Sequence, residues 1–219
     1  GMGEFLDMTV LLVLALMLSA ARRIPELDAM VKSGAWSSFT GSKEENMFGM
    51  DVHHAVLGII GLGRIGEAIA QRAVHGFGMK LLYHNRSRNI AAEQKFAAVY
   101  CGLDELLRES DFVVLMMPLT PETEGFFGRE HFALMKPTAF FINASRGQVV
   151  REKDLIAALR EGRIRGAGLD VYEREPVAPD NPLLTMPNVV TLPHIGSATA
   201  KTRYDMAATA VRNVIRVLR

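Results

Sequence analysis

Polar residues in the second half of the chain have the types and positions needed to bind a small acid and to move a proton. Arg146 stands beside a glycine just after an apolar run, where a guanidinium could hold a carboxylate through two parallel hydrogen bonds. His194 follows a later apolar run, and a histidine beside a carboxylate can hold and deliver a proton near neutral pH. Glu173 and Glu175, shortly before Pro176, could supply that carboxylate. Spacing alone leaves both roles open, because Arg146 could be a surface residue and His194 a structural one.

A Gly-Leu-Gly-Arg-Ile-Gly stretch predicts a site for the phosphates of a dinucleotide. It lies between a short apolar run and a run with helical spacing, which is the strand–turn–helix context that such a site needs. Gly61 would allow the tight turn, Gly63 the approach of a pyrophosphate, and Gly66 the packing of the helix on the strand. The helix beginning near Arg64 and Ile65 would offer free N–H groups and a partial positive charge. An ordinary glycine turn is the alternative.

The residues after the second predicted strand indicate which cofactor the site would prefer. An NAD site usually has Asp or Glu about 20 residues past the glycines, where it binds the ribose 2′-hydroxyl. This chain has Asn85, Arg86, Ser87 and Arg88 there instead. A carboxylate would repel a 2′-phosphate, whereas arginine can hold one with several donors. The loop therefore predicts NADP(H), with NAD also possible, and the alternative is a solvated basic loop without a ligand.

The segment from Pro118 to Thr123 follows another apolar run and has two interpretations. Thr120 could cap a short helix with Pro121 at its first position. Alternatively, Pro118 and Thr123 could contact the cofactor, since this segment would lie at the same sheet edge as the glycine stretch. The stretch that contains Gly196, after the last predicted strand, should join that edge. The sequence does not decide between the two interpretations.

A regular alternation of apolar runs and helical segments must position these residues. Strands that are apolar throughout and separated by helices imply a parallel sheet covered on both faces. Right-handed crossovers then give a doubly wound α/β fold of the Rossmann type, with ligands beyond the carboxyl ends of the strands. The predicted strands are Ala55–Ile60, Lys80–His84, Ala98–Tyr100, Phe112–Met117, Ala139–Asn143, Gly166–Asp170 and Val189–Leu192. The predicted helices between and after them are Ile65–Phe77, Asn89–Lys95, Leu103–Glu109, Arg129–Met135, Glu152–Glu161 and Ala198–Leu218.

The N-terminal part differs from this regular region. Residues 4–34 are predicted to form one long helix, ended by Ser33 and Gly34, and residues 35–219 to form a dinucleotide-binding domain that begins with a loop. Val10–Leu18 is continuously apolar but shorter than the about 20 residues that a membrane span needs. The residues before it are acidic, whereas a signal peptide begins with positive charge. A helix that is apolar on all sides must therefore be covered by other protein.

Composition narrows the function further. Of the 219 residues, 49% are hydrophobic, which is enough for a substantial core. The formal net charge of +1 gives no electrostatic case for nucleic acid or an acidic membrane surface as a partner. Cys101 is the single cysteine, which excludes an intrachain disulfide and predicts a reducing, cytoplasmic location. We expect it to be a small core residue rather than a reactive thiol, and we assign no metal ligand.

Several motifs occur in order and at compatible spacing. They are Gly58–Gly66, Asn143–Gly147, Gly168–Pro176 and Pro193–Thr199, together with Ala21–Glu26 on the first helix. Together they resemble the D-isomer-specific 2-hydroxyacid dehydrogenases, and the branch that they look most like is that of the glyoxylate/hydroxypyruvate reductases. The resemblance runs from about Asp7 to the C-terminus, and the ordered set is far more specific than any one motif.

The resemblance implies a role for each matching residue. Arg146 would bind and orient a 2-oxo acid, and His194 would donate a proton to its carbonyl oxygen during reduction. Glu175, directly before Pro176, would pair with that histidine and stabilise its protonated form. Asp170 would contact the carboxamide of the nicotinamide. The cofactor would supply the hydride, and the protein would supply orientation and charge.

The family also has a substrate domain, most of which has no counterpart in this chain. We therefore expect an NADPH-dependent oxidoreductase acting on a small 2-oxo or 2-hydroxy acid such as glyoxylate or hydroxypyruvate, or the cofactor-binding half of one. The alternatives are a non-catalytic NADP(H)-binding dimeric module and a protein whose substrate lobe another polypeptide supplies. In the family the first helix packs at a two-fold interface. Val10–Leu18 would be exposed in a monomer, which predicts a homodimer through this helix.

Overall fold

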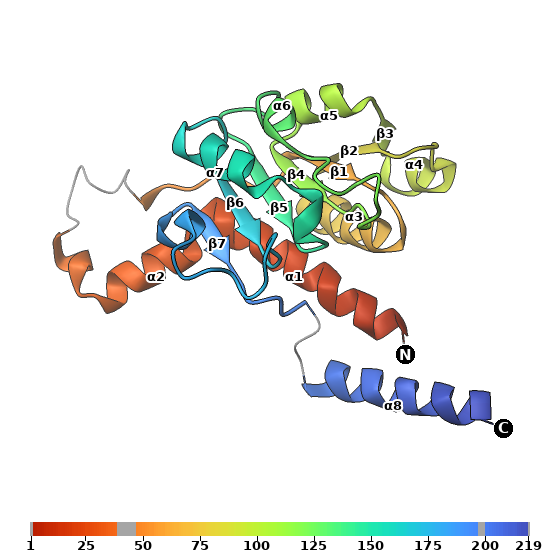
Figure 1. Cartoon of the computed structure of the whole chain (residues 1–219). Coiled ribbons are helices and arrows are strands. Elements are labelled where there is room, and N and C mark those ends of the chain that lie inside the picture. Colours follow the sequence, from red (N-terminus) through yellow and green to blue (C-terminus); the bar gives the residue numbers. More distant parts are fainter. Residues whose placement is uncertain (1, 39–46, 197–199, 219) are drawn as a thin grey trace.

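A parallel seven-stranded sheet forms the centre of the molecule, in the order β3-β2-β1-β4-β5-β6-β7 (Figure 1). The computed structural model describes residues 2–38, 47–196 and 200–218, with side chains over 8–36, 47–196 and 207–218. The strands are β1 Val56–Ile60, β2 Lys80–His84, β3 Val99–Tyr100, β4 Phe112–Leu115, β5 Phe140–Asn143, β6 Gly166–Leu169 and β7 Val189–Thr191. The strand order reverses between β1 and β4, which confirms the predicted doubly wound fold.

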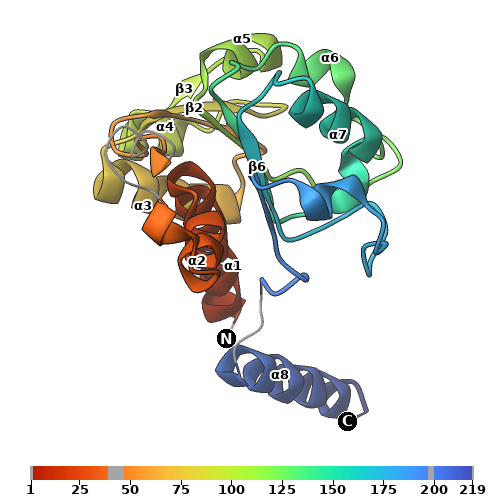
Figure 2. The ribbon, with the colours of Figure 1, turned by 90° about the vertical axis from the view of Figure 1, so that its left-hand side faces the viewer.

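Helices cover both faces of this sheet, because successive strand residues point to opposite sides. Phe112 and Val114 of β4 belong to one core, with α1, α3 and α4, whereas Val113 and Leu115 belong to the other, with α5, α6 and α7 (Figure 2). The α-helices are α1 Met2–Arg22, α2 Ile24–Lys32, α3 Arg64–Phe77, α4 Ile90–Phe96, α5 Leu103–Glu109, α6 Arg129–Phe132, α7 Glu152–Arg160 and α8 Ala200–Leu218. Short 3₁₀ turns are η1 Ala35–Ser38, η3 Gly147–Val149 and η4 Pro182–Thr185.

A strand occurs at every predicted position, but several strands are shorter than predicted. β4 ends at Leu115 rather than at Met117, and β6 ends at Leu169 rather than at Asp170. The next backbone N–H in each case still bonds to the neighbouring strand, from Met116 to Ile60 and from Asp170 to Asn143. Beyond these bonds the chain turns away from the ladder, so that the residues after the strand ends can line a crevice.

The prediction of one long N-terminal helix is wrong, because α1 and α2 meet at Arg23 with a bend of 61°. Pro25 accounts for the break: it has no N–H, and its ring excludes the carbonyl group of the residue four positions earlier. That carbonyl, of Ala21, instead accepts a hydrogen bond of 2.8 Å from the N–H of Met50. The predicted end of the helical region is confirmed, since Gly34 follows α2 with a φ of 81°.

Most of α1 is a core element. The expectation that Val10–Leu18 is exposed in a single chain is wrong, because α1 packs against β5, β6 and α3 and buries most of this run. Exposed positions are confined to a strip that includes Leu11, Ala15 and Leu18. Among the described residues no single helix is long and apolar enough to cross a bilayer, and only α1 and α2 together, with their bend, reach that length and composition.

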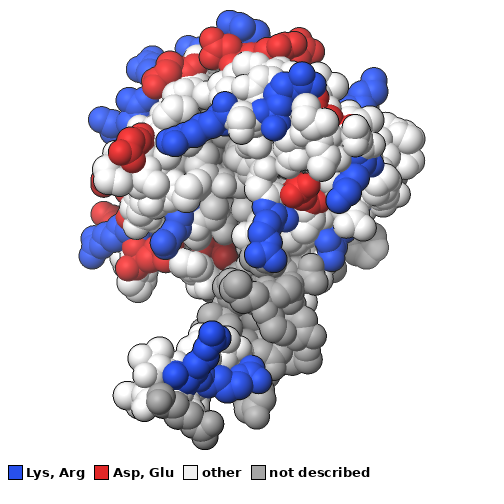
Figure 3. Space-filling model, turned by 90° about the vertical axis from the view of Figure 1, so that its right-hand side faces the viewer, with Lys and Arg blue, Asp and Glu red and all other residues white. Residues whose placement is uncertain are grey.

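The last helix, α8, projects from the body of the molecule near the N-terminus of α1 (Figures 1 and 2). Its described apolar side chains remain largely exposed, among them Val211, Val214 and Ile215. The predicted helix is present from Ala200, and its first predicted residues, 198 and 199, lie outside the described residues. Figure 3 shows basic side chains on α8 and a mixture of basic and acidic ones over the rest of that face.

Candidate active site

A hollow of about 380 Å³ lies at the carboxyl ends of the central strands, where a doubly wound sheet places its ligands. Segments far apart in the sequence form its walls: α1, the start of α3, and the segments after β4, β5, β6 and β7. The lining includes Ile65, Pro118, Arg146, Asp170, His194 and Gly196, all of which the sequence analysis singled out. The fold therefore brings the guanidinium and the imidazole to one space.

In the turn before α3, each of the three glycines has a different steric surrounding. Gly61 adopts a φ of 96°, and an added Cβ would lie 2.8 Å from the carbonyl oxygen of Met116. At Gly66 an added Cβ would lie 3.1 Å from the oxygen of Gly61. At Gly63 nothing lies within 4 Å, so that a ligand could approach the backbone. The first and third glycines thus serve the fold, and the second leaves the approach to the N-terminus of α3 open.

Asn85 supports this turn from the end of β2. Its Oδ1 accepts a 2.6 Å hydrogen bond from the N–H of Leu62, and its Nδ2 donates to the Leu62 carbonyl oxygen at 3.1 Å. Both polar ends of the amide are therefore used within the protein. The residue shapes the turn at which a pyrophosphate would bind.

The two arginines of the loop between β2 and α4 differ in whether another side chain binds their guanidinium groups. Arg88 forms two bonds to Glu93, at 2.7 and 3.2 Å, and Glu93 also accepts from the hydroxyl group of buried Tyr83. The bond from Arg88 is the main cause of the lowered pKa of Glu93. Arg86 and Ser87 are exposed, and Arg86 makes no hydrogen bond or ion pair with any residue that the structure describes. Arg86 is therefore the loop arginine that is available to a ligand.

The segment after β4 forms a single hydrogen-bonded turn, not the short helix that was one of its two interpretations. Thr123 is 8% exposed; its hydroxyl group donates to the carbonyl of Pro118 at 2.6 Å and accepts from the N–H of Thr120 at 2.8 Å. The Thr123 side chain is thus used within the turn, whereas Pro118 lines the hollow.

Arg146 is presented by a loop that Asn143 organises at the end of β5. Asn143 is 1% exposed; its Oδ1 accepts from the N–H of Ser145 at 3.0 Å, and its Nδ2 donates to the carbonyl oxygen of Arg146 at 3.2 Å. The side chain of Arg146 is exposed and, among the described residues, has neither a hydrogen-bond partner nor an ion-pair partner. Its guanidinium is therefore available to an anion in the hollow.

His194, which lines the hollow, forms a pair with Glu175. The imidazole Nδ1 lies 2.6 Å from Oε2 of Glu175, and Oε1 of Glu175 accepts from the backbone N–H of Tyr172 at 3.1 Å. An ionised carboxylate can only accept, so the proton of this contact belongs to Nδ1. That leaves Nε2 as the nitrogen that can exchange a proton with a ligand. The side chains are 52% and 32% exposed, so the pair is accessible.

Asp170 is the buried support of the His194 segment. It is 0% exposed, and its two carboxylate oxygens accept from the N–H groups of Ile195 at 2.8 Å and Gly196 at 3.0 Å. Burial raises the pKa of Asp170, and these two N–H groups act against that rise. His194 itself has a φ of 59°, a strained conformation that these bonds help to hold.

Close packing at Gly147 joins the arginine loop to the glutamate segment. A Cβ at Gly147 would lie 1.9 Å from the carbonyl oxygen of Tyr172, so only glycine fits. The hydroxyl group of Tyr172 donates to the carbonyl oxygen of Leu192 at 2.8 Å, close to His194 in the chain. Burial, followed by the charge of Asp170, raises the pKa of Tyr172 to about 12, so this donor keeps its proton.

Comparison with known proteins decides the family. The model of the D-isomer specific 2-hydroxyacid dehydrogenase NAD-binding domain matches residues 14–196. The chain belongs to this family. Glyoxylate/hydroxypyruvate reductase B of Klebsiella pneumoniae (strain 342) is 58% identical over 206 residues, which are 94% of this chain and 63% of that protein. The reductase B of Escherichia fergusonii is 57% identical over the same lengths. This member of the family thus spans about two thirds of the length of the curated relatives that it matches.

Solved structures of family members agree with the fold. A glyoxylate reductase from Paecilomyes thermophila matches with a TM-score of 0.85 at 34% identity, over 96% of this chain and 61% of that one. The holo form of D-mandelate dehydrogenase from Rhodotorula graminis matches with a TM-score of 0.89 at 33% identity, over 96% and 62%. The part of the fold that this dehydrogenase-family chain shares with them is the dinucleotide-binding part.

Three supporting residues escaped the sequence analysis: Tyr172, Glu93 and Glu152. Tyr172 lies within a quoted motif, but no spacing rule assigns its backbone N–H to Glu175. Glu93 and Glu152 stand in the first turns of helices, where acids are common because of the helix dipole. Only the folded arrangement shows that their carboxylates contact other segments. No group of metal-binding type occurs among the residues that the structure describes.

Proposed function

We propose that this protein is the nucleotide-binding part of an NADPH-dependent oxidoreductase that reduces a small 2-oxo acid, such as glyoxylate or hydroxypyruvate, to the 2-hydroxy acid. The observation that carries the proposal is that an unpaired Arg146 and His194, whose Nδ1 contacts Glu175, line one hollow at the carboxyl ends of the strands, next to the start of α3. In the proposed function these two side chains would be the cation for the substrate and the proton donor, beside the place where a doubly wound fold presents a nicotinamide.

The roles follow from the chemistry of each side chain. Arg146 would hold the 2-oxo acid through parallel hydrogen bonds and fix its orientation. His194 would donate the proton on Nε2 to the carbonyl oxygen, while Glu175 would hold Nδ1 and stabilise the charged ring. The nicotinamide, when bound, would supply the hydride. Asp170 would keep Gly196 and the His194 segment in place, because its two oxygens accept backbone N–H groups of Ile195 and Gly196. Each oxygen has a second lone pair, with which Asp170 would accept from the carboxamide of the nicotinamide.

For the cofactor we propose NADP(H) over NAD. The open approach at Gly63 and the N-terminus of α3 suit the pyrophosphate. Arg86, with Ser87, would bind the 2′-phosphate, because this exposed arginine makes no hydrogen bond or ion pair with a described residue. Asn85 would act indirectly, through the backbone of Leu62.

Fluorescence titration with NADPH and NADH, followed by an assay of NADPH oxidation with glyoxylate and hydroxypyruvate, tests this function. We expect binding of NADPH in preference to NADH, and oxidation that depends on the 2-oxo acid. A chain that binds neither nucleotide would contradict the whole proposal.

A second candidate is a non-catalytic NADP(H)-binding module. The observation in its favour is that the family model that residues 14–196 match is the model of the NAD-binding domain. In this case NADPH would bind without turnover. Turnover that appears only when a second polypeptide is added would instead indicate that a partner supplies the substrate lobe.

We also propose a homodimer through α1, in which the contact surface is the exposed strip of this helix rather than the whole run Val10–Leu18. In the exposed strip of α1, Leu11 is 47% exposed and Leu18 is 38% exposed, although the opposite side of the helix is buried against the sheet and α3. Sedimentation should show a dimer that Leu18→Glu weakens and that Val31→Glu, on α2, leaves intact. A monomeric wild-type chain would contradict the proposed homodimer.

The buried single cysteine supports a cytoplasmic location.

A further inference from the structure

Glu175 lies in the segment from Glu173 to Asn181, and both ends of that segment are hydrogen-bonded to one carboxylate. Glu152, the first residue of α7, accepts through Oε2 from the backbone N–H of Glu173 at 2.8 Å. Its Oε1 accepts from Nδ2 of Asn181 at 2.6 Å. The two oxygens of Glu152 therefore close the segment that carries the partner of His194.

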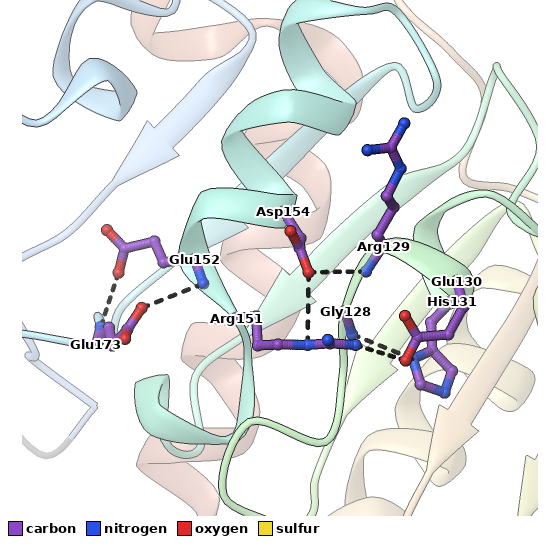
Figure 4. A network of polar contacts seen from close by, with 8 residues as sticks. All are labelled: Gly128, Arg129, Glu130, His131, Arg151, Glu152, Asp154 and Glu173. Carbon is purple, nitrogen blue, oxygen red and sulfur yellow. Dashed lines mark hydrogen bonds and ion pairs between the residues drawn. The ribbon is translucent and has the colours of Figure 1, made fainter.

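The carboxylate of Glu173 in turn binds the backbone of Glu152. Its Oε2 accepts from the backbone N–H of Glu152 at 3.2 Å, so that the two glutamates face each other with paired bonds (Figure 4). This bond caps α7, whose N-cap residue Arg151 makes no side-chain capping bond. The carboxylate of Glu173 thus serves the helix, whereas the carboxylate of Glu152 serves the segment.

Other contacts in the same picture attach α7 to its neighbour α6. Arg151 pairs with Glu130, and Asp154 accepts from the backbone N–H of Arg129 at 3.0 Å (Figure 4). These bonds join α7 to α6 and do not involve the segment. The attachment of α7 to the body is therefore independent of Glu152, and a change at Glu152 acts first on the segment.

The geometry of the acid–base pair is sensitive to where this segment begins. Tyr172, immediately before Glu173, donates its N–H to Glu175. The 2.6 Å contact between Glu175 and His194 is accessible to water, because both side chains are partly exposed. Hydrogen bonds of this kind weaken steeply with distance and angle, and water competes for an accessible one. Loss of the clamp at Glu173 would therefore loosen Glu175 against the ring.

We propose that Glu152 is a positioning residue for the acid–base pair: it clamps the segment so that Glu175 holds His194 with the proton on Nδ1. This inference rests on the proposed function, because the protonation geometry of His194 matters to the reaction only where His194 delivers a proton. Glu152 touches no substrate and is not a catalytic residue.

Two isosteric variants form a matched pair for the test. In Glu152→Gln the amide has one acceptor and one donor end, so one of the two N–H donors that Glu152 now accepts would meet another N–H. In Glu173→Gln the amide oxygen can still cap α7, and the backbone N–H of residue 173 still reaches Glu152. Both variants remove one negative charge from the same place, so charge alone cannot explain a difference between them.

The measurement is the tautomer of neutral His194, read from ¹⁵N-labelled ring correlations above the pH at which the ring titrates. His194→Gln assigns the signals, and Glu175→Ala shows the spectrum of a ring without its partner. We expect the Nδ1–H form in the wild type and in Glu173→Gln, and a shift toward the Glu175→Ala spectrum in Glu152→Gln. A Glu152→Gln spectrum equal to that of the wild type would overturn the inference, as would an equal shift in both variants.

Asn181→Ser gives an independent test should Glu152→Gln fail to fold. Serine can still accept the N–H of Leu183, as Asn181 does at 3.0 Å, but it is too short to reach Glu152. We expect a smaller shift of the His194 spectrum in the same direction. The absence of any shift would overturn the inference.

In the reductase assay Glu152→Gln should lower kcat on the order of 10-fold, with the Kd for NADPH unchanged. Absence of NADPH binding by the wild type would contradict the proposed function alone, since the tautomer reports on the clamp without any cofactor.

Discussion

The two parts of the proposed site are built in different ways. The part proposed for the cofactor, called here the cofactor edge, consists of residues 61–66 and 85–88. Its shape comes from glycines and from one asparagine bonded to a backbone. The proton edge, Arg146, Glu175 and His194, comes from three separate segments that side-chain bonds and close packing hold together. The cofactor edge is thus a local structure, whereas the proton edge exists only in the folded chain.

The arginines extend this comparison. Arg88 at the cofactor edge is bound to Glu93, while the side chains of Arg86 and Arg146 make no hydrogen bond or ion pair with any described residue. The pKa of Glu122 is lowered first by its own backbone N–H and, at longer range, also by the charge of Arg86. A side chain that is already paired has less to gain from a ligand, because the ligand must replace an existing bond. The positive charge that a site offers to a ligand therefore comes mainly from the side chains that have no ion pair within the protein.

The largest expected effect separates the two edges. His194→Ala should lower the rate of 2-oxo acid reduction by roughly 10²–10⁴-fold, which is the usual value of a placed proton donor, and leave the Kd for NADPH unchanged. Steady-state kinetics and nucleotide titration measure the two quantities. His75→Ala, an exposed histidine on α3, is the control and should change neither. Loss of NADPH affinity in His194→Ala would mean that the edges are not separable.

Within the cofactor edge, Arg86→Gln and Arg88→Gln should differ. Loss of a hydrogen bond to a charged group costs about 1.5–3 kcal/mol, so Arg86→Gln should weaken NADPH binding roughly 10–100-fold and leave NADH binding unchanged. Arg88→Gln should have a smaller effect on this preference, because its guanidinium is held by Glu93. Titration of both variants with both nucleotides measures the difference, and equal losses of preference would contradict the division between the arginines.

At the proton edge, Gly147→Ala tests the packing that joins its segments. The added Cβ would meet the backbone of Tyr172, and overpacking of this kind costs about 1–3 kcal/mol of unfolding free energy. Gly76→Ala in α3 is the matched control, since an added Cβ there meets nothing within 4 Å and a helical alanine gains up to about 1 kcal/mol. Thermal unfolding should give opposite signs for the two variants. A Gly147→Ala protein of unchanged Tm would show that the segments can move apart without cost.

The smallest expected effect is a pH dependence at the cofactor edge. Arg88 holds the pKa of Glu93 below its usual range, so the stability from this pair is present above the pKa of the unfolded state. It is lost as the pH falls through the lowered pKa of the folded state. The difference in Tm between the wild type and Glu93→Gln should therefore shrink between neutral and strongly acidic pH. The pair is exposed, so a small difference is expected, and one that grows toward acid would contradict this account.

Particular elements show how far sequence reasoning reached. Hydrophobic runs predicted all seven strands, because the strands of a parallel sheet covered on both faces are mostly apolar. The edge strand β3 and its neighbour β2 are the partly exposed exceptions. The N-terminal helix was predicted as one element because its apolar pattern continues past Pro25, whose missing N–H breaks it. Exposure of Val10–Leu18 was also predicted wrongly, since an apolar run does not say what covers it and here the sheet does.

The sequence by itself determined the parallel α/β fold and the positions of the glycine turn and the basic loop, because each of these depends on residues close together in the chain or on a repeating pattern. It marked Arg146, Glu175 and His194 only as candidates, through motifs that occur in order along the chain. Only the tertiary structure decided that Arg88 is paired, that Asp170 and Asn85 bind backbone, and that Glu152 holds the segment of Glu175. The reason is physical: a hydrogen bond is made over about 3 Å between atoms that the fold brings together, and sequence spacing does not encode that distance for residues on different segments.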